Sequence, residues 1–190
     1  MASGSGQLTV TARVGILTVS DRASAGEYLD QSGPEIRELV VERLGGEVVD
    51  YAIVPDDPDA IRTVLVTWVD ARQLDLVLTT GGTGFAPRDV TPEATRSIIQ
   101  RETPGLVFAM LHHSLQITPH AMLTRAVAGI RGRTLIVNLP GSPKAARECL
   151  ESILPALPHA LAMLANASGA EADHDFNRSA AGTAPPDREA

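Results

Sequence analysis

The sequence predicts an α/β fold with three layers, in which helices cover both faces of a mostly parallel sheet. Short runs of β-branched and aliphatic residues alternate along the chain with longer segments whose apolar residues fall on one helical face. This alternation is typical of a parallel sheet with helices on both sides. Hydrophobic residues make up 44% of the chain and aromatic residues only 3%, so we expect a largely aliphatic core.

The 190 residues predict one folded domain over residues 12–165 with a tail on each side. Residues 1–11 are small and polar, and residues 166–190 have almost no large apolar side chain, so both tails are expected to be disordered. The chain shows neither a signal peptide nor an apolar run of the ~20 residues that a membrane span needs, which predicts a cytoplasmic protein without membrane contact. The net charge of −7 disfavours a nucleic-acid-binding protein.

The first half of the domain predicts three strands and two helices. Apolar residues at positions 36, 39, 40 and 44 share one helical face, and Gly45-Gly46 then ends that helix. Pro55 ends the second strand. In chain order, we expect a strand over 14–19, a helix over 33–44, a strand over 48–54, a helix over 58–71 and a strand over 74–78.

The second half predicts helices around one further buried strand. Thr91 suits the N-cap of a helix and Pro92 its first position, with Glu93 favoured by the positive helix end. In chain order, we then expect a helix over 105–115, an extended segment over 121–131, a strand over 134–138 and helices over 143–152 and 155–165.

Polar and turn residues follow four of the predicted strands. They are Ser20-Asp21-Arg22, Pro55-Asp56-Asp57, the loop Thr79-Thr80-Gly81-Gly82-Thr83-Gly84, and Asn138-Leu139-Pro140-Gly141-Ser142. Ligands of open α/β sheets bind beyond the carboxyl ends of the strands, so we expect these segments to meet at one edge.

The glycine loop is the strongest local indication of a ligand. Gly81, Gly82 and Gly84 allow positive φ angles and close backbone approach, so that successive N–H groups can point at an anion while Thr83 adds a hydroxyl. A tight strand-to-helix turn without a ligand is the alternative. The Arg88-Asp89 pair and the helix start that follow favour the functional interpretation.

Asp89 and Asp56 are candidate ligands of a divalent cation. Mg²⁺ in proteins typically uses one or two carboxylates together with substrate phosphates. The alternative for Asp89 is a solvated side chain favoured by the helix dipole. The segment Asn138–Pro143 suggests a second phosphate or base pocket. Lys144 in the first helical turn favours a ligand there, because a cation at that position is unfavourable unless an anion is bound. Ser142 could instead simply cap that helix.

Together these segments resemble the molybdenum-cofactor biosynthesis domain, found in bacterial molybdopterin adenylyltransferases (MogA type), in MoaB proteins and in the G domain of gephyrin. The resemblance rests on the run from Thr79 to Thr95 and covers about residues 13–165. It extends to four further segments: 17–21, 53–56, 128–132 and 135–142.

The resemblance implies transfer of AMP from Mg-ATP to the terminal phosphate of molybdopterin, with release of pyrophosphate, by a homotrimer. A partner that inserts molybdate would act downstream. Asp56 and Asp89 would be catalytic and hold Mg²⁺. The implied nucleotide-binding residues are Gly81, Gly82, Thr83, Gly84, Asn138, Gly141, Ser142 and Lys144. The implied molybdopterin-binding residues are Ser20, Asp21, Ser114 and Thr124.

One alternative remains within the resemblance. A MoaB-like trimer could hold molybdopterin as a carrier or scaffold without transferring AMP. Some MoaB-type members lack the Arg-Asp pair after the glycine loop, whereas Arg88, Asp89 and Asp56 are all present here. Their presence favours the adenylyltransferase.

Overall fold

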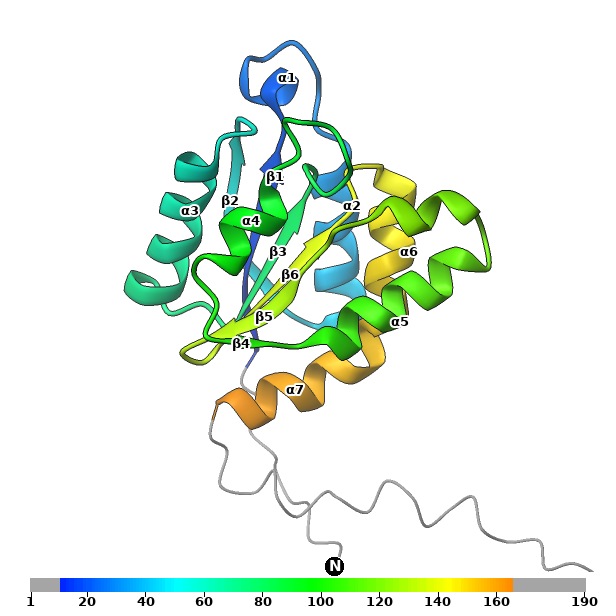
Figure 1. Ribbon diagram of the computed structural model, residues 1–190. Coiled ribbons are helices and arrows are strands. Elements are labelled where there is room, and N and C mark those ends of the chain that lie inside the picture. Colours follow the sequence, from blue (N-terminus) through cyan, green and yellow to red (C-terminus); the bar gives the residue numbers. More distant parts are fainter. Residues whose placement is uncertain (1–10, 166–190) are drawn as a thin grey trace, which may run out of the picture.

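The computed structural model describes residues 11–165; the tails predicted for residues 1–11 and 166–190 lie, apart from residue 11, outside this range. A six-stranded sheet forms the centre, with the spatial order β2-β1-β3-β6-β5-β4 (Figure 1). Four neighbouring strands are parallel: β1 (Arg13–Val19), β2 (Glu47–Val54), β3 (Leu76–Thr80) and β6 (Thr134–Leu139). The short β5 (Ala128–Arg131) pairs antiparallel with β6, and β4 (Arg101–Glu102) pairs antiparallel with β5 at the edge of the sheet. The predicted α/β class with a mostly parallel sheet is therefore confirmed.

Helices cover both faces of the sheet, which gives the three predicted layers. One face carries α2 (Ser32–Leu39), α5 (Pro104–Leu115), α6 (Pro143–Ile153) and α7 (Leu157–Leu164). The other face carries α3 (Pro58–Val66) and α4 (Thr91–Arg96). The remaining helical segments are α1 (Asp21–Ser24), the π-helical turns Val40–Leu44 and Thr67–Ala71, and the 3-10 turns Pro119–Leu123 and Leu154–Ala156.

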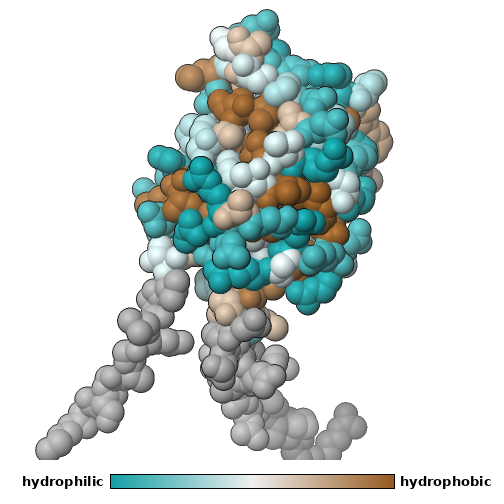
Figure 2. Space-filling view, turned by 90° about the vertical axis from the view of Figure 1, so that its left-hand side faces the viewer, coloured by the Kyte–Doolittle hydropathy of each residue, from teal (hydrophilic) through white to brown (hydrophobic). Residues whose placement is uncertain are grey.

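Two aliphatic cores hold these layers together. On β1, Ile16 faces the core beneath α2 and α6 while its neighbour Leu17 faces the core beneath α3, because successive side chains of a strand point to opposite faces. Both residues are fully buried. Burial on both faces explains why β1, β3 and β6 are continuous apolar runs rather than alternating ones. Figure 2 shows the side of the molecule that carries α3, where hydrophilic residues surround separate hydrophobic patches.

Most of the predicted elements are found, with shifted ends. The helix predicted over 33–44 is α2 followed by the π-helical turn, and it ends at Gly45 in the left-handed conformation with φ of 68°. The predicted third strand begins and ends two residues later, as β3, so Thr79 and Thr80 belong to the strand and are buried.

The prediction of an extended segment over 121–131 is wrong for its first part. Residues 119–123 form a 3-10 turn, whose Thr118 hydroxyl accepts the N–H of His120. The chain becomes a strand only at Ala128, where it pairs with β6. A Pro-initiated 3-10 turn was not evident from the apolar pattern, because these apolar residues partly face outward: Met122 and Leu123 are exposed. Among the described residues, no helix combines the length and hydrophobicity of a membrane span.

Candidate functional site

The carboxyl ends of the four parallel strands meet at one edge of the sheet, as predicted. Ser20 follows β1, Asp56 follows β2, and the glycine loop continues directly from β3. Gly141 follows β6 and lies against the loop, because a Cβ placed on Gly141 would be 3.2 Å from the Gly81 Cα. Segments that are more than a hundred residues apart in the sequence therefore form one site.

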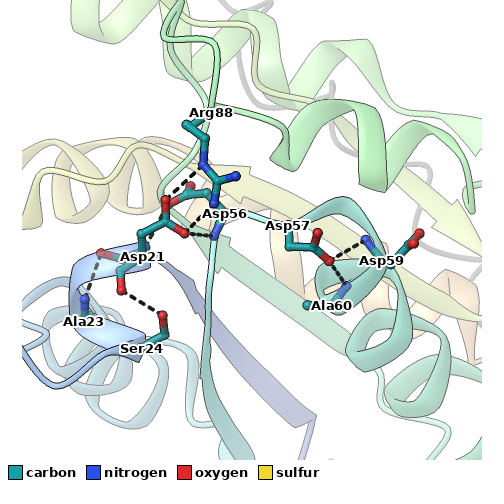
Figure 3. A network of polar contacts seen from close by, with 9 residues as sticks. Asp21, Ala23, Ser24, Asp56, Asp57, Asp59, Ala60 and Arg88 are labelled. Atoms are coloured by element: carbon teal, nitrogen blue, oxygen red, sulfur yellow. Dashed lines mark hydrogen bonds and ion pairs between the residues drawn. The ribbon is translucent and has the colours of Figure 1, made fainter.

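Asp21 and Asp56 are locked together by reciprocal hydrogen bonds (Figure 3). The Asp21 N–H donates to Asp56 Oδ2 at 2.8 Å, and the Asp56 N–H donates to Asp21 Oδ1 at 3.0 Å. Arg88 then binds both carboxylate oxygens of Asp21, with Nε 3.0 Å from Oδ2 and Nη2 2.7 Å from Oδ1. This bidentate pair ties the far end of the glycine loop to the strand ends of β1 and β2.

The two carboxylates of this pair have opposite electrostatic environments. The hydrogen bond from Arg88 and the N–H of Asp56 hold the pKa of Asp21 below its usual value. Burial raises the pKa of Asp56, and the negative charges of Asp21 and Asp89 add to this effect against the opposing hydrogen bond from the Asp21 N–H. Asp56 is thus a carboxylate whose ionised form gains from a nearby cation.

Asp89 faces the same space as Asp56. Its Oδ2 accepts the N–H of Ala86 at 2.8 Å, which fixes the carboxylate at the end of the loop. The two aspartates line one cavity of about 250 Å³ together with Ser20, Gly81 and Gly82. In the part of the chain that is described, no three His, Cys, Asp or Glu side chains form a metal-binding group. Two carboxylates with space for phosphate oxygens nevertheless fit Mg²⁺, which favours that mixed coordination.

The glycine loop is held in a conformation that few other residues could adopt. Gly81 has φ of 98° and Gly82 has φ of 61°. The loop is fixed from α4, where the Thr91 hydroxyl donates to the Gly81 carbonyl at 2.9 Å. Thr91 was predicted as the N-cap, but Val90 has that position and Thr91 is the first helical residue. The Thr91 side chain bonds the loop instead of the helix, which propensity alone could not reveal.

Arg125 is a structural determinant of this site that the sequence did not single out. Its N–H donates to the Thr83 carbonyl at 2.9 Å, and its Nε donates to the Gly84 carbonyl at 2.7 Å. Its guanidinium also binds the Asp89 carbonyl and the Glu93 carboxylate. Arg125 therefore ties the last residue of the glycine loop to Asp89 and to the start of α4. The sequence offered only a basic residue next to Thr124.

A second cavity lies on the other side of the glycine loop. Its volume is about 320 Å³, and its walls come from α5, the 3-10 turn over 119–123 with Thr124 after it, α6 and the end of β6. Ser114 and Thr124 line it, as do Thr83, Gly84 and Asn138. The loop thus separates two cavities, with Gly81 and Gly82 in the wall of one and Thr83 and Gly84 in the wall of the other.

This division differs from the grouping expected from sequence. Ser20 was expected beside Ser114 and Thr124, but it lines the cavity that holds Asp56 and Asp89. Thr83, Gly84 and Asn138 were expected with the nucleotide, but they line the cavity of Ser114 and Thr124. The order of residues along the chain could not predict which of the two cavities each residue of the loop would line.

The side chain of Asn138 is fully buried and bound within the protein. Its Nδ2 donates to the hydroxyls of Thr79 and Thr95, both at 2.9 Å, and its Oδ1 accepts the N–H of Val127 at 3.1 Å. It joins β6 to β3, to α4 and to the segment before β5. Asn138 therefore forms part of the cavity wall while its side-chain amide is hydrogen-bonded to groups of the protein.

Of the predicted residues around the start of α6, Ser142 and Lys144 line neither cavity, whereas Gly141 does. Ser142 has the N-cap position but makes no side-chain capping bond. The Lys144 side chain is 79% exposed, with Nζ 3.8 Å from Glu148 Oε1. Gly141 lines the cavity of the aspartates.

Asp30 is a further cavity-lining carboxylate that the sequence did not single out. It accepts hydrogen bonds from the hydroxyls of Thr18 and Tyr51 and from Ser32 and Gly33 at the start of α2. Burial opposes its ionisation, but these donors outweigh burial and lower its pKa. Burial and the Asp30 contact raise the pKa of Tyr51 to about 12. Asp30 therefore fixes one wall of the cavity while its hydrogen-bonding capacity is used internally.

Comparison with known proteins gives consistent matches over the whole described domain. A family model described as a probable molybdopterin binding domain matches residues 15–159. Gephyrin of Dictyostelium discoideum is 49% identical over 80% of the chain, which spans only 22% of gephyrin. A molybdopterin adenylyltransferase of Helicobacter pylori J99 is 47% identical, with coverage of 81% of this chain and 88% of that protein. The crystal structure of the molybdopterin biosynthesis enzyme MoaB of Thermus thermophilus matches with a TM-score of 0.77 and 56% identity, over 81% of this chain and 96% of that chain.

Proposed function

Because the chain belongs to the family of probable molybdopterin-binding domains, we propose that it is a molybdopterin adenylyltransferase of molybdenum-cofactor biosynthesis. It transfers AMP from ATP to the terminal phosphate of molybdopterin and releases pyrophosphate. The single observation that carries this proposal is the pair of cavities on either side of the glycine loop, with Asp56 and Asp89 in only one of them. Two substrates that exchange a group need two adjoining sites, and the carboxylates mark the site of the nucleotide.

The two cavities divide the substrates in this proposal. The cavity with Asp56, Asp89, Gly81 and Gly82 receives the nucleotide phosphates. The cavity with Ser114 and Thr124 receives molybdopterin, and the loop residues Thr83 and Gly84 lie where its phosphate approaches the nucleotide. Relatives named molybdopterin adenylyltransferase, 43–47% identical to this chain, support the choice of the two substrates.

The reaction needs positioning more than acid–base chemistry. The terminal phosphate of molybdopterin is already an anion near neutral pH, so it attacks the α-phosphorus without a general base. A new phosphorus–oxygen bond forms as the bond to the pyrophosphate leaving group breaks. Repulsion between two anions is the main barrier, and it is reduced by the loop N–H groups and by fixed geometry.

Asp56 and Asp89 would hold Mg²⁺, which offsets phosphate charge when it is bound. Asp56 Oδ2 and Asp89 Oδ2 each accept a backbone N–H, so both carboxylates are oriented before any ligand arrives. Arg88 lies beside them, paired with Asp21. The homotrimer, the cytoplasmic location and a molybdate-insertion partner downstream belong to the same proposal. The exposed apolar side chains Phe108, Ile117 and Met122 offer surface that association could bury.

The deciding experiment incubates the purified chain with molybdopterin, ATP and Mg²⁺ and measures adenylylated molybdopterin and pyrophosphate. We expect both products in equal amounts, because ATP is cleaved at the α-phosphorus rather than the γ-phosphorus. Binding of molybdopterin without product would instead support the carrier. Binding of neither substrate would overturn both assignments.

The pKa of Asp56 predicts the pH dependence of Mg²⁺ binding. Burial and the charges of Asp21 and Asp89 raise this pKa in the folded protein. Protonated Asp56 therefore stabilises the fold relative to ionised Asp56, and this stabilisation is lost as the pH rises through the folded-state pKa. The ionised form binds Mg²⁺, and the affinity for Mg²⁺ in the presence of a nucleotide should therefore fall as the pH is lowered, beginning above the ~3.9 of an ordinary aspartate.

Asp21→Asn tests the cause of this shift by calorimetric titration of Mg²⁺ across pH. The substitution removes one of the charges that raise the Asp56 pKa, while the amide oxygen can still accept the Asp56 N–H. We expect the pH below which Mg²⁺ affinity falls to be lower in the variant. If that pH were unchanged or higher, it would contradict the electrostatic coupling of the two carboxylates.

A further inference from the structure

The cavity assigned to molybdopterin contains one acidic side chain, Glu148, among the described residues that line it. The rest of the wall consists mainly of aliphatic side chains and hydroxyls, contributed by α5, the 3-10 turn with Thr124 after it, α6 and the glycine loop. Helices α5 and α6 lie side by side in the fold (Figure 1). Glu148 lies on the second turn of α6, next to the cavity-lining Cys149. A single carboxylate in a mainly uncharged wall suggests that it binds a group of the ligand.

Glu148 has a weak partner inside the protein. Its side chain is 26% exposed, and the cation closest to it is Lys144 Nζ at 3.8 Å, beyond hydrogen-bond distance. The Lys144 side chain is itself 79% exposed, so water competes for it. Glu35 differs, because its Oε2 accepts a hydrogen bond from Arg147 Nη1 at 2.7 Å. Within the described residues no group donates a hydrogen bond to the Glu148 carboxylate, so its oxygens are available to donors of a ligand in the cavity.

The pterin ring supplies the donors that such a carboxylate needs. Its pyrimidinone edge presents a ring N–H beside an exocyclic amino group, two parallel donors spaced like those of a guanidinium. A carboxylate accepts such a pair in bidentate geometry. The phosphate at the other end of molybdopterin carries negative charge and is repelled by Glu148. The hydroxyls of Thr83 and Thr124 lie elsewhere in the same wall and suit that phosphate.

We propose that Glu148 recognises the amino-pyrimidinone edge of the pterin and thereby fixes the direction in which molybdopterin enters its cavity. This inference rests on the proposed function, because it takes the second cavity as the molybdopterin site. Glu148 is a specificity residue: it orients the substrate so that the phosphate points toward Thr83, Gly84 and the nucleotide cavity. It takes no part in the bond changes.

The test measures binding of molybdopterin to the full chain by the change in pterin fluorescence. Glu148→Gln keeps the size of the side chain but replaces one acceptor oxygen by a donor, so affinity should fall about 10- to 100-fold, as for loss of a hydrogen bond to a charged group. Glu151→Gln is the matched control on the same helix, because Glu151 pairs with Arg147 at 3.5 Å and does not line the cavity. The control should bind as the unmodified chain does.

A second measurement uses the unmodified chain and two small ring analogues, a methylpterin and the matching methyllumazine. The lumazine has a carbonyl oxygen where the pterin has its amino group, so it should bind at least about tenfold more weakly, and Glu148→Gln should abolish this preference. Equal binding of both analogues by the unmodified chain would overturn the role of Glu148 even if the variant failed to fold.

The two proposals fail in different ways. If the unmodified chain adenylylates molybdopterin while Glu148→Gln binds it with unchanged affinity, the role of Glu148 is wrong and the proposed function stands. If the unmodified chain binds neither molybdopterin nor the methylpterin, the assignment of the cavity is wrong, and the role of Glu148 falls with it.

Discussion

Replacing Asp89 by Asn should lower the rate of AMP transfer by about a thousandfold or more while the protein remains folded. Loss of one preorganised charge-stabilising group at a reacting centre typically costs a factor of about 10²–10³, and Asp89 would additionally be a metal ligand. The amide oxygen of Asn can still accept the Ala86 N–H that orients this side chain, so the loop should keep its shape. The measurement is the single-turnover rate with saturating molybdopterin and ATP, at several Mg²⁺ concentrations.

Asp59→Asn is the matched control for the loss of one negative charge. Asp59 lies on α3, where its exposed side chain pairs with Arg62 at 2.7 Å and lines neither cavity. We expect Asp59→Asn to transfer AMP at the normal rate, and molybdopterin to bind equally to both variants. A normal rate for Asp89→Asn would exclude this carboxylate from the reaction. Loss of molybdopterin binding in the same variant would show that the cavity of Asp89 is not the nucleotide cavity alone, and would contradict the proposed division of the substrates.

Replacing Gly81 by Ala should destabilise the protein by about 2–5 kcal/mol and abolish nucleotide binding. Its φ of 98° is unfavourable for any residue with a Cβ, and the added Cβ would lie 2.2 Å from the Val19 carbonyl oxygen. Backbone strain of this kind costs about 1–3 kcal/mol, and overpacking adds a similar amount. Because β1 is part of the central sheet, the loop must move rather than the strand. The free energy of unfolding in urea and the affinity for ATP are the quantities to measure.

Gly105→Ala provides the comparison for this substitution. Gly105 lies in the first turn of α5, and a Cβ placed there meets no atom within 4 Å. The change should leave stability unaltered or raise it slightly, because alanine lowers the conformational entropy of the unfolded chain. If Gly81→Ala were as stable as Gly105→Ala, the close approach of the loop to β1 would not be a constraint on this fold.

The long, regular elements were predictable because their determinants are local. The buried run of β1 and the amphipathic face that includes Ile36 and Leu39 follow from apolar periodicity, and the helix end at Gly45 follows from the need for a left-handed residue. The turn at 119–123 was missed because its apolar residues are not spaced for any regular element and partly face solvent. The short helix α1 was also missed, since four residues carry too little pattern.

By itself, the sequence determined the α/β class, the order of the main elements and the concentration of polar residues at the strand ends. These features depend on apolar periodicity and on glycine and proline positions, which are properties of neighbouring residues. Only the tertiary structure decided that Asp21 and Asp56 pair reciprocally, that Arg125 clamps the loop, and that Glu148 shares a cavity with Ser114. Those contacts join residues far apart in the chain, and their geometry depends on how strands align and on which face each helix packs, which local patterns do not encode.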